Sequence, residues 1–175
     1  MKKNIIISII IVLVVVGAGV LLFKYGNNPK SSQSMNSIAY AGSDNDVISQ
    51  EGIHWHPKLV VYINGEIQEI PANVGIGTQY SSNRFYDPMM QMTNIHTHDN
   101  SGQLHWEVMS GPVRKGDIRL KNFFEIWGKT FNSSQIFDSV SNDKLKVKMF
   151  VNGQVNEDYE NYIVKDKDKI EMRYE

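Results

Sequence analysis

The sequence contains no cysteine among its 175 residues. This absence excludes disulfide bonds, thiolate metal sites and a cysteine nucleophile. A surplus of basic residues is also absent, because 18 Lys and Arg are balanced by 19 Asp and Glu, for a formal net charge of −1. Proteins that bind nucleic acid usually carry excess positive charge to neutralise phosphates, so we expect no nucleic-acid partner.

Charge and histidine are distributed unevenly along the chain. Residues 1–43 contain four Lys and no acidic residue, which leaves 14 basic and 19 acidic side chains in residues 44–175. All five histidines lie between His54 and His105. The N-terminal part is therefore basic, the remainder is acidic, and the histidines form a local group.

One long apolar run occurs near the N-terminus, from Ile5 to Phe23. At a helical rise it would extend roughly 28 Å, close to the thickness of the hydrocarbon core of a bilayer. Lys2 and Lys3 precede the run, and basic residues favour the cytoplasmic side. Residues 1–24 are therefore predicted to be a single-pass transmembrane anchor in contact with membrane lipid, with the rest of the chain outside the cytoplasm.

A cleaved signal peptide is the alternative interpretation of this run. The apolar core of a signal peptide is usually about 7–15 residues long and is followed closely by a small-x-small site. The sequence Ala39-Tyr-Ala41 begins 16 positions after Phe23, which favours a retained anchor. Residues 25–50 are rich in Ser, Asn, Gly and Asp and predict a flexible linker. Residues 51–175 are predicted to form one extracytoplasmic domain.

Two segments of this domain have the pattern of β-hairpins. Lys58–Ile63 is rich in β-branched and aromatic residues, ends in Asn64-Gly65 and is followed by Glu66–Ile70. Lys146–Val155 repeats the pattern around Asn152-Gly153. Asn-Gly is the strongest short signal for a hairpin turn. Both segments are therefore predicted to fold as antiparallel strand pairs.

One amphipathic helix is expected between the two hairpins. Large apolar residues recur there at helical spacing, at Leu120, Phe123, Phe124 and Trp127. Asp117 is a candidate cap at the start of the helix, and Gly128 is a candidate stop. The aromatic stripe is interpreted as a core-facing surface rather than a cofactor site.

A final strand is predicted from the alternating residues Ile170–Tyr174, as part of an edge strand from Lys169 to Tyr174. Together these elements predict an α+β fold, a mainly antiparallel β domain with one packed helix. The order of the elements after His105 is that of a β-grasp-like C-terminal part, a comparison at the level of fold only.

Three histidines are predicted to meet on one face of a further hairpin. Residues 99–102 have turn composition, and a two-residue or a four-residue loop gives the same register, in which paired positions sum to 201. This register places His96 opposite His105, and His98 opposite Gln103 on the same face. The opposite face is then a candidate core face, with Ile95, Thr97, Leu104 and Trp106.

His54-Trp-His-Pro57 forms a second histidine pair. In an extended chain His54 and His56 point to the same side, so both imidazoles can reach one ion. Histidines that only make hydrogen bonds are the alternative, but their confinement to two clusters favours metal ligation. Asp99 and Glu107 are candidate carboxylates, as a fourth ligand or as acceptors that orient an imidazole, and Asp99 equally fits a role in the turn. The predicted metal ligands are thus His54, His56, His96, His98, His105 and Asp99.

The metal is expected to be copper, with zinc as the second choice. Without cysteine, the blue-copper, zinc-finger and iron–sulfur types of site are excluded, and His-rich zinc, copper, nickel or non-haem iron remain. Met89, Met90 and Met92 precede His96, and thioethers are soft ligands that suit Cu(I). Each methionine also fits a simple packing role.

Several motifs resemble those of uncharacterised membrane-anchored exported proteins from archaea and some bacteria. The similarity covers Ile53–Glu175 and includes His54-Trp-His-Pro57, Tyr62-Ile-Asn-Gly65, Ile70-Pro-Ala-Asn-Val-Gly-Ile76, His96-Thr-His-Asp99 with Ser101-Gly102 and His105, and Phe123-Phe-Glu-Ile-Trp-Gly-Lys129. The resemblance implies an exported location and a histidine site, and it implies no catalytic activity.

Three functions are compatible with these features. The first is a membrane-anchored extracytoplasmic protein that binds, buffers or transfers copper or zinc through its histidines. The second is a zinc-dependent hydrolase or hydratase, in which three His hold the metal and Glu107 or Asp99 acts as the base. The third is a metal-stabilised accessory subunit of a membrane complex, with a membrane protein as partner. No recognisable catalytic motif is present, so a non-enzymatic function is favoured.

Overall fold

The computed structural model describes residues 43–175. The predicted anchor and the predicted linker up to residue 42 lie outside the described residues. Within residues 43–175 the chain forms a mainly antiparallel β domain with one α-helix, as predicted. In this part of the chain, no helix is both long enough and apolar enough to cross a bilayer.

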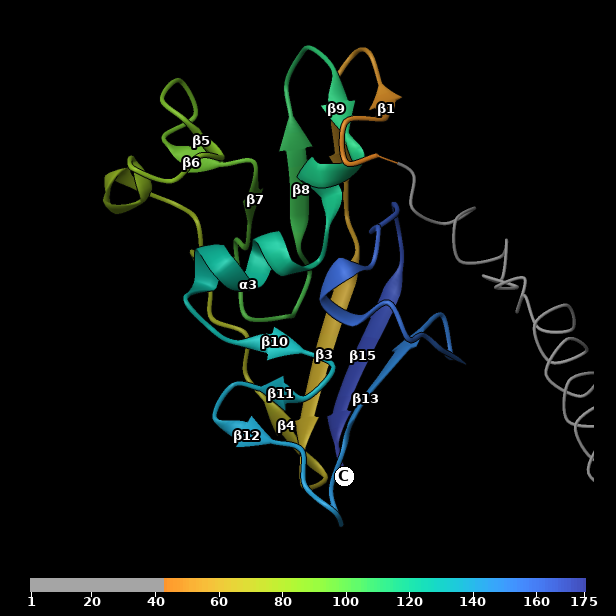
Figure 1. The fold of residues 1–175 in the computed structure, drawn as a ribbon. Helices are drawn as coiled ribbons and strands as arrows, with labels where there is room; N and C mark the ends of the chain where they lie inside the picture. The colour runs from red at the N-terminus through yellow and green to blue at the C-terminus, as the bar shows by residue number, and fades with distance from the viewer. Residues whose placement is uncertain (1–42) are drawn as a thin grey trace, which may run out of the picture. The chain divides into compact units, whose positions relative to one another are not determined.

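The largest sheet has five strands in the spatial order β14-β13-β15-β3-β4 (Figure 1). In chain order these are β3 (Lys58–Ile63), β4 (Glu66–Gln68), β13 (Val147–Val151), β14 (Gln154–Val155) and β15 (Lys169–Tyr174). β15 pairs antiparallel with β13 and parallel with β3, and the other neighbours pair antiparallel. The two chain segments that meet in the centre are therefore more than 100 positions apart in the sequence.

Both Asn-Gly hairpins form as predicted. Asn64 and Gly65 have φ values of 53° and 83°, and Asn152 and Gly153 have φ values of 52° and 82°. A two-residue turn with positive φ at both positions matches the right-handed twist of the strands it joins. Asparagine and glycine adopt this conformation at the lowest cost, which explains why the sequence identifies these hairpins.

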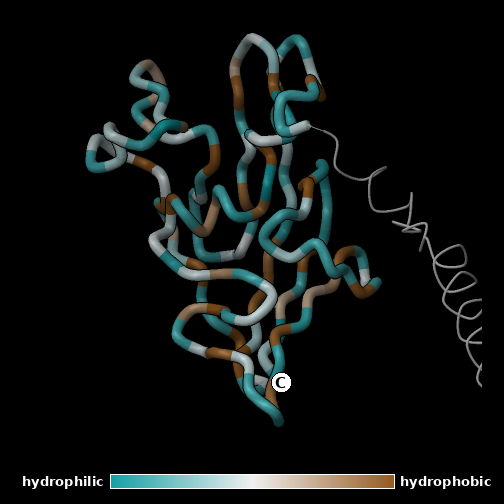
Figure 2. Tube along the Cα trace, viewed as in Figure 1, coloured by the Kyte–Doolittle hydropathy of each residue, from teal (hydrophilic) through white to brown (hydrophobic). Residues whose placement is uncertain are grey.

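The predicted location of the last strand is wrong, because β15 is the central strand of the sheet and not an edge. Its burial alternates, with Ile170, Met172 and Tyr174 buried in the core. Figure 2 shows this alternation of hydrophobic and hydrophilic residues along the central strands. The alternate positions are less buried and carry the charged side chains of Lys169, Glu171 and Arg173.

The helix α3 (Lys121–Trp127) packs its aromatic stripe into the core. Gly128 ends the helix with φ 71°, and its N–H is bonded to the carbonyls of Phe124 and Glu125. Asp117 does not cap this helix. It lies in the preceding 3-10 helix (Lys115–Ile118) and accepts the N–H of Arg114, because the chain completes a separate turn before α3 begins.

A second sheet contains the histidines and has the order β2-β8-β7. Its strands are β2 (Ile53–Trp55), β7 (Ile95–His96) and β8 (His105–Val108). In Figure 1, β7 and β8 lie on one side of α3, and the large sheet extends on the other side. The chain passes from β2 into β3 through only two residues, His56 and Pro57, so the histidine sheet and the large sheet are separate sheets joined by a short connection.

The folded domain begins earlier than the predicted boundary at residue 51. Residues of the predicted linker form β1 (Val47–Ser49), which pairs with β9 (Val113–Arg114). Asp46 and Asp44 form ion pairs with Lys115 and Arg119. The strand is short and largely exposed, so no hydrophobic periodicity marks it in the sequence.

The remaining strands are short and form two small sheets. One is the hairpin of β5 (Tyr86–Asp87) and β6 (Met92–Thr93). The other consists of β10 (Phe131–Asn132), β11 (Gln135–Ile136) and β12 (Ser139–Val140). Two further 3-10 helices occur at Thr78–Tyr80 and Tyr159–Asn161. None of these elements contains a histidine, but Thr93 of β6 lies in hydrogen-bond contact with His96.

Candidate metal centre

The predicted register of the histidine hairpin is confirmed. His96 pairs with His105, and Ile95 pairs with Trp106, so paired positions sum to 201. The rings of His96 and His105 are stacked, with centroids 5.3 Å apart and an interplanar angle of 12°. The positions of His96 and His105 in the histidine cluster are well defined, because both residues lie in paired strands.

The loop of this hairpin is longer than predicted. The strands separate after His96 and before His105, so residues 97–104 form the connection. Thr97 exchanges backbone hydrogen bonds with Asn73 and Val74 instead of crossing the hairpin. A two-residue or four-residue turn is therefore wrong, although the register is unaffected.

The other side of the loop also pairs elsewhere. The N–H of Leu104 donates to the carbonyl of Pro57, and the N–H of Leu59 donates to the carbonyl of Gly102. Gln103 forms a bridge with Lys58, so it is not opposite His98 as predicted. This pairing joins the loop to the start of β3.

The predicted core face of the hairpin is confirmed. Each of its four side chains is at most 1% exposed, namely Ile95, Thr97, Leu104 and Trp106. The hydroxyl of Thr97 donates to the carbonyl of Pro71 and accepts the N–H of Val74, which explains how a polar residue is buried there. The apolar side of the hairpin thus anchors the histidine side.

The second histidine pair lies beside His105. β2 pairs with β8 so that His54 is opposite Glu107 and Trp55 is opposite Trp106. The His56 ring is 4.8 Å from the His105 ring, and the His54 ring is 4.6 Å from that of His56. All five histidines therefore belong to one cluster, with His105 on its central strand.

The ligand atoms form two groups of three. His54, His56 and His105 form one, and His96, His98 and His105 form the other, with all ligand atoms of a group within 4.8 Å of one another. In the second group Nε2 of His96 and Nε2 of His98 are 3.3 Å apart, within hydrogen-bond distance in the absence of an ion. Two nitrogens bound tetrahedrally at zinc–nitrogen distances would be about 3.3–3.4 Å apart. This pair therefore has the spacing of two ligands of one ion.

His96 is oriented by a buried hydrogen bond. Its Nδ1 lies 2.9 Å from the carbonyl oxygen of Thr93, and a carbonyl can only accept, so Nδ1 carries the proton. Burial, the largest effect, lowers the pKa of His96, which is fully buried. The neutral ring then presents the lone pair of Nε2 to the cluster. A backbone acceptor of this kind is the usual support of a metal-binding histidine.

His105 is also held neutral. Burial, followed by repulsion from the other four imidazoles, lowers the pKa of His105 to about 4. Near neutral pH its ring therefore has a free lone pair. Because metal ions bind neutral imidazole, no proton has to be displaced from a charged ring before binding.

The two candidate carboxylates differ in their surroundings. Glu107 Oε2 lies 3.9 Å from Nε2 of His96, and the side chain is 22% exposed. Asp99 is exposed, and its carboxylate accepts the N–H of Ser101. Hydrogen bonds from Ser101 also lower the pKa of Asp99. Asp99 thus makes the contacts of the turn, and the charges of His105 and His98 also act on it. Glu107 is the carboxylate that lies within 4 Å of a histidine ring nitrogen in residues 43–175.

Sequence reasoning missed two residues that position the site. The carbonyl of Thr93 orients His96, but any residue can supply a carbonyl, so no side-chain signal marks it. Asp166 accepts the backbone N–H of His56 at 2.9 Å across 110 positions. The sequence presents Asp166 only as part of a charged turn, and its contact arises where β15 joins β3.

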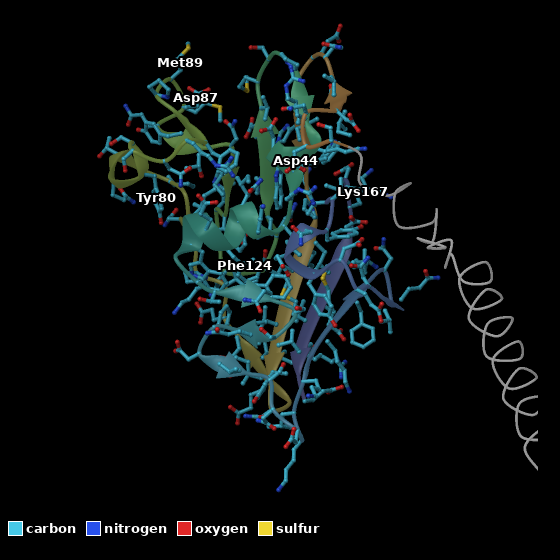
Figure 3. The ribbon with its side chains drawn as sticks, in the orientation of Figure 1. Asp44, Tyr80, Asp87, Met89, Phe124 and Lys167 are labelled. Atoms are coloured by element: carbon cyan, nitrogen blue, oxygen red, sulfur yellow. The ribbon has the colours of Figure 1, made fainter. Side chains whose placement is uncertain are left out.

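Of the three methionines that favoured copper, Met89 is exposed to solvent. Figure 3 shows Met89 pointing away from the domain, near Asp87 at the β5–β6 hairpin. Its side chain is 93% exposed. Met89 therefore has neither a core-packing role nor contact with the histidine rings.

Comparisons with protein-family models, with curated proteins and with solved structures give no match for this chain.

Proposed function

We propose that this protein binds a transition-metal ion outside the cytoplasm through its histidine cluster, with His96, His98 and His105 as the principal ligands. The observation that carries this proposal is the His96–His98 nitrogen pair, 3.3 Å apart. The lone pair of His96 is directed into the cluster by the Thr93 carbonyl. His54 and His56 are the additional ligands, and Glu107 is the carboxylate that offsets the charge of the ion.

Copper is the preferred ion and zinc the second. The cluster offers imidazole nitrogens and one nearby carboxylate oxygen, a set that suits both metals. Among divalent first-row ions, Cu(II) binds such a set most tightly. The spacing of the His96 and His98 nitrogens also fits tetrahedral zinc. We therefore prefer copper over zinc on the ground of affinity and not of geometry.

Reversible binding, as in capture, buffering or transfer of the ion, fits the exposure of the ligands. His54 and His98 are exposed, whereas His96 is buried, so an ion can enter from solvent and meet a rigid ligand. Within residues 43–175 the core contains 24 buried apolar side chains that do not depend on a metal. A purely structural role for the ion is therefore less favoured than exchange with solvent.

A zinc-dependent hydrolase or hydratase is the second candidate, and Glu107 is the observation that favours it. A three-histidine ion with an open position lowers the pKa of a bound water to about 7. Glu107 lies 3.9 Å from the His96 nitrogen, within reach of such a water. In that reaction Glu107 would take the proton of the attacking water.

We also propose that residues 1–24 anchor the domain in the membrane, as their apolar run indicates. For the fold, we propose that the large sheet and α3 are β-grasp-like. The first hairpin, the helix and the last strand support this, since β15 lies parallel to β3 in the centre of the sheet. An anchored domain of this kind would keep its metal outside the cytoplasm, where a membrane-protein partner could receive it.

The proposal is tested by the metal content of the full chain, purified in detergent without a polyhistidine tag. We expect mass spectrometry to find copper or zinc, and the metal-free protein to bind Cu(II) and Zn(II) tightly on titration. His105→Ala should abolish tight binding, because His105 belongs to both groups of ligands. Gln103→Ala is the matched control, since this exposed side chain lies two residues away.

Two results would decide against this function. If wild-type protein neither contains nor takes up either metal, the cluster is not a metal site. If His105→Ala binds as tightly as Gln103→Ala, the ion binds elsewhere. Circular dichroism of both variants ensures that a loss of binding is not a loss of fold.

A further inference from the structure

The two groups of ligand atoms share a single residue, His105. His54 and His56 complete one group, and His96 and His98 complete the other. Among the described residues, the ring contacts between the two pairs all pass through His105. His105 is thus the only ring that touches both sides of the cluster in this part of the chain.

The strand order explains this division. β8 lies between β2 and β7, so His54 and His56 approach His105 from one neighbouring strand and His96 from the other. Neighbouring strands are about 4.8 Å apart, which puts β2 and β7 about 9–10 Å from each other. The two histidine pairs are therefore held on opposite sides of the His105 ring.

One ion does not fit all five rings as they are arranged. Ligand nitrogens at about 2.1 Å from a shared ion cannot be more than about 4.2 Å apart. In residues 43–175 the five histidines form two compact triads rather than one larger group. Each triad by itself has the number of histidines that a three-histidine site requires.

We propose that the cluster binds two transition-metal ions, one in each triad, with the imidazole of His105 as a bridging ligand. The proposal rests on the metal-binding function proposed above. One ring nitrogen of His105 binds each ion. Neutral His105 has one ring proton, and binding of the second ion releases this proton to solvent, so that the ring bridges as an imidazolate. The ions would then be about 6 Å apart.

Access and charge both support a two-ion site. Each triad includes one exposed histidine, His54 in the first and His98 in the second, so either ion can enter from solvent. The bridging imidazolate and the Glu107 carboxylate supply two negative charges between and beside the ions. The excess of acidic residues in 44–175 further favours the binding of cations to this domain.

Titration of the metal-free full chain with Cu(II), followed by electron paramagnetic resonance, tests this proposal. We expect two equivalents to bind. The second should reduce the integrated signal of the first, because two Cu(II) ions joined by an imidazolate are magnetically coupled. The double variant His54→Ala/His56→Ala should bind one equivalent and give an uncoupled Cu(II) spectrum. His98→Ala should weaken the site of His96 and His105 and leave the site of His54, His56 and His105 able to bind Cu(II).

The possible outcomes separate this proposal from the proposed function. Uptake of one equivalent by wild-type protein, or of two equivalents with full uncoupled intensity, would overturn the bridged pair while leaving metal binding intact. A lack of any Cu(II) uptake would overturn both. Because wild-type protein alone gives these results, the conclusion does not depend on whether the double variant folds.

Discussion

Histidines in the cluster differ in how much the fold depends on them. His96 is fully buried and hydrogen-bonded to the Thr93 carbonyl. His98 lies two positions further along and is exposed. Truncation of a buried side chain leaves a cavity and an unpaired acceptor, whereas an exposed side chain can be removed at little cost. Stability and metal binding should therefore respond differently at these two positions.

His96→Ala should lower the free energy of unfolding of the metal-free protein by about 2–4 kcal/mol, since both packing and the hydrogen bond to Thr93 are lost. His98→Ala should change it by less than about 0.5 kcal/mol. Both variants should lose metal affinity. Urea unfolding in the presence of a chelator measures the first effect and metal titration the second. Equal destabilisation by the two variants would contradict the burial of His96.

Asp168 is another buried polar residue and lies next to the start of β3. Asp168 is 4% exposed and accepts three hydrogen bonds, from the Tyr162 hydroxyl, the Asn152 amide and the N–H of Lys165. Its own carbonyl accepts the N–H of Lys58. Because its carboxylate is fully paired, Asp168 can be buried and can tie three segments together.

The pKa of Tyr162 is raised, chiefly by burial and also by its bond to Asp168. An unfolded chain loses the tyrosine proton at about pH 10, whereas the native state retains it to higher pH. The native state thus binds more protons above that pH, and the stability from this group is complete below about pH 10 and is lost as the pH rises further.

Tyr162→Phe should therefore be less stable than wild type by about 1–2 kcal/mol near neutral pH, through loss of a hydrogen bond to a carboxylate. The difference between the two proteins should decrease as the pH rises above about 10, because only wild type has a tyrosine proton to lose at this position. Urea unfolding at several pH values measures it. A difference that stays constant over this range would show that Tyr162 ionises normally in the native state.

At the level of elements, the segment after β4 determines how deeply His96 is buried. The backbone of residues 73–75 pairs with Thr93 and Thr97 along the free edge of β7. Gly75 has φ 81°, and a Cβ atom there would overlap the Thr93 hydroxyl and lie 2.6 Å from the carbonyl oxygen of Ile95. Only glycine fits this position, because the strand that carries His96 lies directly against it.

Gly75→Ala should destabilise the protein by about 2–4 kcal/mol, from backbone strain and overlap together. It should also weaken metal binding, because relief of the overlap displaces the Thr93–His96 strand. Gly111→Ala is a matched control, with φ 86° and no atom within 4 Å of the added Cβ. It should cost only about 1–2 kcal/mol from strain and leave metal affinity unchanged. Equal effects of the two substitutions on affinity would refute the positioning role.

At the level of the whole domain, residues 43–50 make contacts with the domain that their amino-acid composition does not predict. β1 pairs with β9, and Arg114 donates to the carbonyl of Asn45. The ion pair of Asp44 with Arg119 is exposed on its acidic side, so it contributes little by itself. The pairing of β1 is therefore the main reason to assign residues 43–50 to the domain.

A chain that begins at residue 43 should be more stable than one that begins at residue 51, by about 1–2 kcal/mol, because the shorter chain loses the β1–β9 hydrogen bonds and the ion pairs. Thermal unfolding of the two proteins in the presence of a chelator measures this difference. Equal melting temperatures would favour the domain boundary at residue 51 that the sequence predicts.

The local sequence determined the features that depend on short-range chemistry. Asn64-Gly65 and Asn152-Gly153 determined two hairpins, because few other residues adopt positive φ at both turn positions. The spacing of Phe123, Phe124 and Trp127 predicted the helix. The turn composition of residues 99–102 predicted the pairing of His96 with His105, although the connection is longer than this turn. In each case the residues that interact are close together in the chain.

Only the tertiary structure decided how separate segments meet. It placed β15 in the centre of the sheet, bonded His56 to Asp166, and moved residues 97–104 out of the hairpin because residues 57–59 and 73–75 offered other partners. It also put β2 beside β8, which joins the two histidine pairs through His105. Backbone hydrogen bonds between distant strands carry little side-chain information. The sequence therefore predicted the group of His96, His98 and His105 and the separate pair of His54 and His56, but not that His105 joins them.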